Sequence, residues 1–317
     1  MLTSSSSRHD KQSLLLAAVT FDLHSHDAPE DWDVSRDTLA RLGIRGTFFM
    51  PTSLLAQRRY DAPLSALVAA GHEVGSHGHR HDPYEIRALR EGRAASIGFL
   101  ALSRDLLGER LGRAPRSFRS PCWCGVGPHA LDELARLGYE VDASATPQRL
   151  GLLSSYPRHN PWILAARRPT LPRPGLMEIP TSSFLIPLGS PTLATLRSGS
   201  RAFLRMLEAE ARLSGSVLNI QLHPEDLVDT PRRKLGPFSL RHLLPFPGDG
   251  IRARWYLRTN DASVIRRAAL GLLEDVRRHR CLPLSEVRGE LLRARDGRDR
   301  ATGGATTVAP SAIDPEA

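Results

Sequence analysis

Three strand-like runs in this chain lead directly into ionisable residues, and this repeated pattern restricts the possible folds most. The runs are residues 14–21, 73–76 and 216–222, and they lead into Asp22 and His24, into His77 and His81, and into His223. Polar residues after buried strands are typical of parallel α/β folds, in which the carboxyl ends of the strands share one edge. Side chains far apart in the sequence are therefore expected to meet there.

Helical and strand-like segments alternate along the chain, which predicts one α/β domain over residues 13–296. Either an α/β barrel or a doubly wound sheet suits a chain of 317 residues. Further strands are expected at 45–50, 115–119, 139–142 and 281–285, and helices at 33–42, 64–70, 85–112, 128–137, 200–213, 262–280 and 286–294. Residues 146–176 and 231–258 are expected to be irregular, and residues 1–12 and 297–317 to be disordered tails.

His77 and His81 stand four residues apart in a segment that holds four of the twelve histidines. If the backbone makes one helical turn here, both rings project from one face and can share a divalent cation such as zinc. The alternative is a polar surface turn that is rich in histidine by chance. The position directly after a predicted strand favours the metal site.

The formal charge of +9 raises the question of nucleic-acid binding. Almost all the basic residues are arginines, with Lys11 and Lys234 the only lysines, and they are spread along the chain without basic runs. We therefore expect no nucleic-acid partner. The three cysteines offer no disulfide framework.

No segment reaches the roughly 20 apolar residues of a membrane span. Cleavage of the short run 13–19 as a signal peptide would destroy the first predicted site strand. We therefore expect no transmembrane segment and a cytoplasmic location.

Five motifs occur in the order in which the polysaccharide deacetylase family has them. They are Thr20-Phe21-Asp22, Thr47-Phe48-Phe49, His77-Gly78-His79-Arg80-His81, Arg119-Ser120-Pro121-Cys122 and Leu222-His223-Pro224. The chain thus resembles this family, also called the NodB-homology family or carbohydrate esterase family 4, over roughly residues 14–295. The resemblance implies a distorted, incomplete (β/α) barrel.

The resemblance also implies a role for each matching residue. Asp22 would be the catalytic base, and Arg119 would orient its carboxylate by a charge-assisted hydrogen bond. His77 and His81 would bind a divalent metal ion, with Zn²⁺ expected. His223 would be the general acid that protonates the leaving amine.

The first motif departs from the family because Leu23 stands where a second acid, the third metal ligand, is usual. A subgroup has this acid one residue later, where the chain has His24. We predict that His24 is the third ligand, which gives a three-histidine site compatible with zinc. The alternatives are that Asp22 binds the metal while His24 faces the substrate, or that His26 or Asp27 is the ligand. A degenerate relative that binds no metal is a further alternative.

Five residues are expected to bind the substrate: Pro121, Cys122, Trp123, Asp142 and Leu222. Cys122 stands where the family motif has Tyr, and Trp123 could either stack on a sugar or lie in the core. Asp142 could tune His223 or cap the next helix. Leu222 would line the pocket for the acyl methyl group.

The expected function is a metal-dependent hydrolase that removes an N-acyl group, foremost acetyl, from an amino sugar. The sugar would belong to a glycan, a lipid-linked sugar or a glycosylated metabolite. The apolar segment 238–246 could admit a lipid tail, and peripheral membrane contact would follow from that. A deformylase, an O-deacetylase and a catalytically degenerate carbohydrate-binding relative are the alternatives.

Overall fold

The computed structural model describes residues 14–91, 94–123, 126–147, 168–229, 245–246, 250–251 and 261–302. One sheet dominates this described part of the chain, and its strands follow the order β11-β1-β2-β3-β4-β5-β7-β6, with β8 also paired to β1. The strands are β1 (Leu16–Asp22), β2 (Thr47–Met50), β3 (Glu73–Ser76), β4 (Ser117–Phe118), β5 (Val141–Asp142), β6 (Thr170–Arg173), β7 (Leu176–Glu178), β8 (Leu218–Leu222) and β11 (Arg280–Cys281). All the pairings except that of β6 with β7 are parallel.

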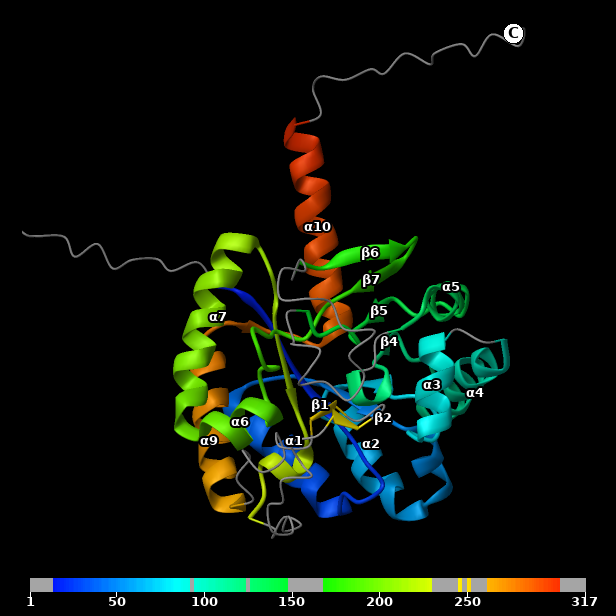
Figure 1. Ribbon diagram of the computed structural model, residues 1–317, viewed down its shortest axis with the longest axis horizontal. Coiled ribbons are helices and arrows are strands. Elements are labelled where there is room, and N and C mark those ends of the chain that lie inside the picture. Colours follow the sequence, from blue (N-terminus) through cyan, green and yellow to red (C-terminus); the bar gives the residue numbers. More distant parts are fainter. Residues whose placement is uncertain are drawn as a thin grey trace, which may run out of the picture.

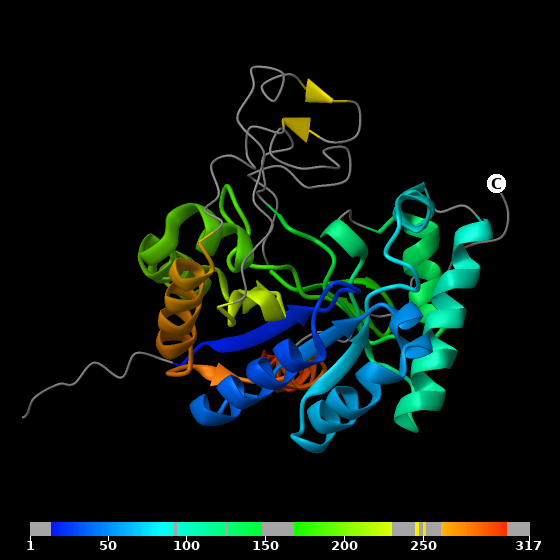
Figure 2. The ribbon, with the colours of Figure 1, turned by 90° about the horizontal axis from the view of Figure 1, so that it is seen from below.

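Helices pack around the outside of this curled sheet (Figures 1 and 2). They are α1 (Pro29–Leu42), α2 (Asp61–Ala69), α3 (Pro83–Glu91), α4 (Ala94–Leu111), α5 (Pro128–Arg136), α6 (Ser190–Leu196), α7 (Ser200–Ser214), α9 (Ala262–Val276) and α10 (Leu284–Thr302). Short 3₁₀ turns include η1 (Thr52–Ala56), η3 (Pro121–Trp123) and η7 (Pro224–Asp226). A separate small antiparallel pair joins β9 (Pro245–Phe246) to β10 (Gly250–Ile251). The expected α/β fold with an incomplete barrel is confirmed.

Strand β1 lies at the centre because it pairs with β2, β8 and β11. Its sequence is almost entirely apolar, and six of its seven residues are buried, as expected for a strand covered on both faces. The main core packs the odd-numbered side chains of β1, such as Val19 and Phe21, against the surrounding helices. Phe21 stacks on Phe48 of β2 with ring centroids 4.8 Å apart. This packing fixes the end of β1, where the first site residue lies.

Several helix predictions are wrong at their boundaries, and α9, predicted to reach residue 280, ends at Val276. The predicted helix 85–112 is two helices, α3 and α4. The carbonyl of Leu89 near the end of α3 accepts a hydrogen bond from the N–H of Gly127, outside the helix, which caps α3 there. The predicted helix 286–294 continues to Thr302 as α10, so the prediction of disorder is wrong for residues 297–302.

Only parts of the other segments that were predicted to be irregular or disordered lie among the described residues. The predicted irregular segment 146–176 contains strand β6 and the first residue of β7, so that prediction is wrong for these residues. The predicted tail 1–12 and most of the segments 146–176 and 231–258 lie outside the described residues. Among the residues that the structure describes, no helix is both long and apolar enough to cross a lipid bilayer.

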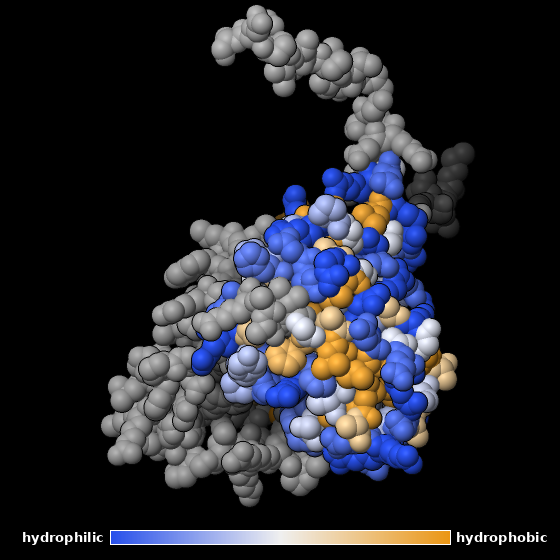
Figure 3. Space-filling view, turned by 90° about the vertical axis from the view of Figure 1, so that its right-hand side faces the viewer, coloured by the Kyte–Doolittle hydropathy of each residue, from blue (hydrophilic) through white to orange (hydrophobic). Residues whose placement is uncertain are grey.

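The face of the molecule near α3, α4 and α5 carries hydrophobic residues in a band with hydrophilic residues around it (Figure 3). Tyr84 of α3 and Leu102 of α4 are among the exposed large apolar side chains, with 59% and 41% of their surface accessible. Single exposed apolar side chains are normal for a folded protein.

Candidate active site

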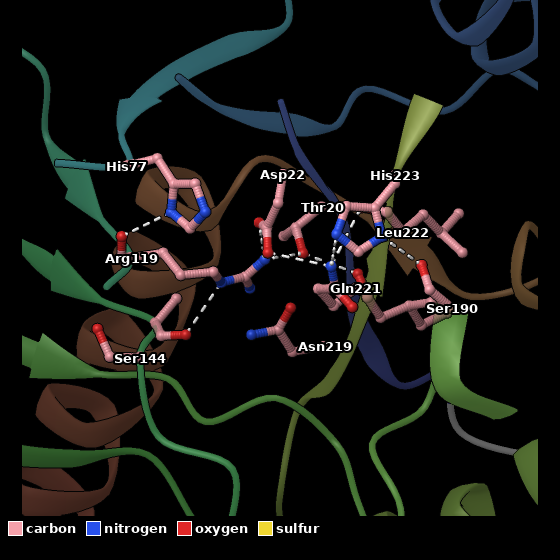
Figure 4. A network of polar contacts seen from close by, with 12 residues as sticks. Thr20, Asp22, His77, Arg119, Ser144, Ser190, Asn219, Gln221, Leu222 and His223 are labelled. Atoms are coloured by element: carbon pink, nitrogen blue, oxygen red, sulfur yellow. Dashed lines mark hydrogen bonds and ion pairs between the residues drawn. The ribbon is translucent and has the colours of Figure 1, made fainter. Parts of the chain in front are cut away.

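The site lies where β1, β3, β4 and β8 end. Asp22 is the last residue of β1, and His223 follows the last residue of β8. His77 follows β3, and Arg119 follows β4. Because these strands are parallel neighbours, their carboxyl ends converge, and the four side chains lie together as expected (Figure 4).

Asp22 is held by two hydrogen bonds from groups far away in the sequence. Its Oδ1 accepts from Nη1 of Arg119 at 2.8 Å, and its Oδ2 accepts from Nε2 of Gln221 at 3.0 Å. Burial favours a higher pKa for Asp22, but the charge of Arg119, with smaller contributions from His77 and His223, brings the pKa below its ordinary value. Asp22 is therefore an oriented, ionised carboxylate.

Arg119 is itself fully buried and fixed on several sides. Its Nη1 also donates to Oγ1 of Thr20 at 2.8 Å, and its Nε donates to the carbonyl of Ala143 at 3.0 Å. The guanidinium lies over the ring of Phe49, 4.4 Å from its centroid. The predicted contact between Arg119 and Asp22 is thus present, in a geometry that leaves the arginine little freedom.

Three histidine rings form a candidate metal site beside Asp22. One nitrogen from each of His24, His77 and His81 lies within 4.8 Å of the others. The ring centroids of His77 and His81 are 5.0 Å apart, and that of His24 is 4.8 Å from His81. The predicted pair and its predicted third partner therefore come together.

The hydrogen bonds and protonation of these rings suit metal binding. Nδ1 of His77 lies 2.8 Å from the carbonyl of Arg119, which can only accept, so this nitrogen carries the proton and Nε2 keeps its lone pair. Burial is the main cause that lowers the pKa of His77 to about 3 and also lowers the pKa of His24 and of His81. Nδ1 of His24 is buried without a hydrogen-bond partner among the described residues. Three neutral imidazoles with free nitrogen atoms are a ligand set that fits Zn²⁺.

The backbone between His77 and His81 is not the helical turn that the spacing suggested. Gly78 has a φ of 78° and His81 a φ of 59°, so the segment is a loop with two left-handed residues. The predicted helical turn is therefore wrong, although the rings of His77 and His81 do meet. A side chain placed on Gly78 would collide with the carboxylate of Glu85, which lies behind the loop.

The alternative ligands differ in their surroundings. Both oxygens of Asp22 are already engaged by Arg119 and Gln221. Asp27 is buried, and its Oδ2 accepts the backbone N–H of His24 at 2.6 Å, which positions the segment that follows β1. His26 is exposed, although its ring stacks near that of His24. His24, His26 and Asp27 form a second group with metal-ligand spacing, so this alternative stays open.

His223 belongs to a hydrogen-bond relay on the other side of Asp22. Its Nδ1 lies 2.8 Å from Oγ of Ser190, and the same hydroxyl bonds to the carboxylate of Asp226. Because a carboxylate only accepts, the hydroxyl donates to Asp226 and accepts the proton of His223 Nδ1. Nε2 of His223 then faces Nε2 of Gln221 at 3.3 Å.

The five residues that were predicted to bind the substrate lie in different surroundings. Asp142 is buried and accepts hydrogen bonds from the backbone and hydroxyl of Ser144, so it closes the turn after β5 and has no bond to His223 among the described residues. That it binds substrate, tunes His223 or caps the next helix stays a prediction. Leu222 and Pro121 are buried, and Cys122 is exposed with a φ of 58°. The side chain of Trp123 lies outside the described residues.

Asp142 faces a second acid across the sheet, since it is paired with Glu178 of the neighbouring strand. Burial raises the pKa of Asp142 to about 6, and burial together with the charge of Asp142 raises the pKa of Glu178 to about 8. Near neutral pH the two carboxyl groups therefore tend to hold one proton between them.

Sequence reasoning missed Gln221, Ser190 and Glu85. Gln221 could have been found, because polar residues at alternate positions of a buried strand, here Asn219, Gln221 and His223, lie on one face. Ser190 carries no local signal, since its partner Asp226 lies 36 residues further along the chain.

Fold and site together define an α/β protein with a histidine-rich candidate metal centre at the carboxyl edge of its sheet. A family model described as polysaccharide deacetylase matches residues 10–141, which include Asp22 and the three histidines but not His223. This part of the chain is thus similar to the polysaccharide deacetylase family, as the motifs indicated. No curated protein matched the chain.

The chain is also similar to several solved structures. A Mycobacterium smegmatis protein described as a polysaccharide deacetylase is 16% identical, with 90% of this chain and 93% of that chain covered and a TM-score of 0.56. A peptidoglycan deacetylase from Bacillus subtilis is 13% identical, with 92% and 98% covered and a TM-score of 0.47. A chitin deacetylase from Colletotrichum lindemuthianum is 14% identical, with 87% and 88% covered and a TM-score of 0.45. The first of these structures shares the fold of this chain.

Proposed function

We propose that the chain is a metal-dependent hydrolase that removes an N-acyl group, foremost acetyl, from an amino sugar. The observation that supports this most is the placement of three neutral histidines beside an ionised, arginine-bound aspartate. The amino sugar would be part of a glycan, a lipid-linked sugar or a glycosylated metabolite. His24, His77 and His81 would hold the cation, with Zn²⁺ expected.

In this mechanism a bound cation would supply Lewis acidity that polarises the attacking water and the acyl carbonyl. Asp22 takes the proton from the water as general base. Arg119 keeps the carboxylate ionised and aimed, because its fixed guanidinium donates to Oδ1 only 2.8 Å away. Gln221 restrains the other oxygen, so that Asp22 has little rotational freedom.

His223 completes the reaction by protonating the leaving nitrogen, which would otherwise depart as a very poor anion. The relay through Ser190 to Asp226 stabilises the positive charge that the ring carries as an acid. Leu222 stays a predicted wall for the acyl methyl group, although its side chain lies in the main core, on the face of β8 opposite Gln221.

The test is a screen of the purified protein for release of acetate or formate from N-acylated sugars, nucleotide sugars and lipid-linked sugars. We expect acetate from at least one class of N-acetylated sugar. Release of formate, or of acetate only from O-acetylated sugars, would instead identify one of the alternative activities. A protein that binds glycans but releases neither acid would contradict the proposal.

Replacing Ser190 by Ala is expected to lower kcat about 10-fold or more, with KM little changed. The hydroxyl links His223 to a carboxylate, and a hydrogen bond to a charged group contributes roughly 1.5–3 kcal/mol. Steady-state kinetics on the substrate found in the screen measure this effect. Ser65→Ala, on exposed helix α2, is the matched control. Unchanged kcat in Ser190→Ala would remove the relay from the mechanism.

A further inference from the structure

Three backbone N–H groups of the loop that carries His81 donate hydrogen bonds to one buried carboxylate, that of Glu85. Oε1 of Glu85 accepts the N–H of His79 at 2.5 Å. Oε2 accepts the N–H groups of Arg80 and His81, each at 2.8 Å. Glu85 is fully buried in the first turn of α3, directly behind the loop.

The carbonyl groups of the same loop are bound on its other side. The carbonyl of Gly78 accepts from the N–H of Thr52 at 3.0 Å and from the hydroxyl of Ser103 at 3.1 Å. The carbonyl of His79 accepts from the N–H of Ser53 at 2.9 Å. Turn η1 and Glu85 therefore hold the loop between them, one through its carbonyls and the other through its N–H groups.

This arrangement accounts for the two left-handed residues of the loop. A Cβ on Gly78 would lie 2.6 Å from Oε1 of Glu85, so the carboxylate occupies the space that a side chain there would need. His81 has a φ of 59°, a conformation that is unfavourable for a residue with a side chain unless neighbouring contacts hold it. The bond from its N–H to Glu85 is such a contact.

We propose that Glu85 is a positioning residue that holds His81, and with it the whole candidate metal loop, in the geometry for binding the cation. The inference rests on the proposed function, in which His24, His77 and His81 bind a metal ion. Glu85 does not contact the three rings in this role. It fixes the backbone from which His81 projects, so that the ligands are in place before the cation arrives.

The experiment is the Zn²⁺ affinity of the full-length apo-protein, measured by competition with a chromophoric chelator. Glu85→Gln should bind Zn²⁺ roughly 10–100-fold more weakly, the range seen when groups that orient metal ligands are lost. Gln offers one acceptor oxygen where the loop presents three N–H donors, so its own NH₂ group would face one of them. Glu91→Gln, at the exposed end of the same helix, should keep the affinity of the natural protein.

Circular dichroism will show whether Glu85→Gln folds. If it does not, Gly78→Ala serves as a second variant. It should also weaken Zn²⁺ binding, because its methyl group displaces Glu85, and Gly98→Ala in α4, which has open space for a methyl group, is its control. If the folded variants bind Zn²⁺ as tightly as the natural protein, the positioning role of Glu85 is overturned, while the proposed metal site is not. A natural protein that binds no Zn²⁺ would overturn the proposed metal site itself.

Discussion

Replacing Asp22 by Asn is expected to reduce kcat about 10³-fold while the protein keeps its bound metal, because a positioned general base contributes roughly 10²–10⁴-fold. Asn has nearly the same shape and can still accept a hydrogen bond from Arg119. The amide of Gln221 can turn to accept from the new NH₂ group. The geometry should therefore survive while the basic group is lost.

The same substitution leaves the buried charge of Arg119 without its nearest partner. Breaking a buried ion pair costs about 3 kcal/mol or more of folding stability, so the melting temperature should also fall. Asp37→Asn, on the exposed side of α1, is the matched control and should change neither property. Metal analysis is the decisive measurement: if Asp22→Asn strips the metal, Asp22 is a ligand and the assignment as base is wrong.

Replacing His77 by Ala should remove the metal and, with it, the activity. The ring is buried, and its Nδ1 is already committed to the carbonyl of Arg119, so Nε2 is the nitrogen that would bind the metal. The loss of affinity should exceed the roughly 100-fold reached by changes behind the ligands. Activity should fall by at least about 10³-fold, since a Lewis acid contributes several kcal/mol.

The control for this change lies two residues away. His79 bonds to Oγ1 of Thr52 and stacks near Phe99, so it points away from the candidate metal site. His79→Ala should keep one equivalent of metal, measured by mass spectrometry of the purified protein. Equal metal content in the two variants would show that the proposed three-histidine site does not hold the metal.

Most of the sheet could be predicted because its strands are short apolar runs that end in polar residues. This pattern alone predicts that Asp22, His77, Arg119 and His223 share one edge of the sheet. The pattern depends on where strand-like runs end in polar residues, which is a local property of the sequence. The helices were harder to delimit, since contacts near their ends, such as that of Gly127 with the Leu89 carbonyl of α3, come from other parts of the chain.

The fine structure of the site could not be predicted for the same reason. The left-handed backbone at His81 depends on Glu85, and the orientation of His223 depends on Ser190. Asp142 also stands at a strand end, and its bond to the N–H of Ser144 closes its own turn, a contact that its position in the sequence does not predict. Spacing in the sequence identifies which residues reach the edge of the sheet, but not which partners they find there.

The pairing of β1 with β8 has a consequence for the order in which the site is built during synthesis. All three candidate ligands lie between residues 24 and 81. Gln221 lies in β8 and His223 directly follows it, about two thirds of the way along the chain. A contact between such distant segments forms late, because closing a long loop is entropically costly. The growing chain would thus acquire its histidines well before its proton donor, and a nascent protein would pass through a stage that can capture a cation but cannot turn over substrate.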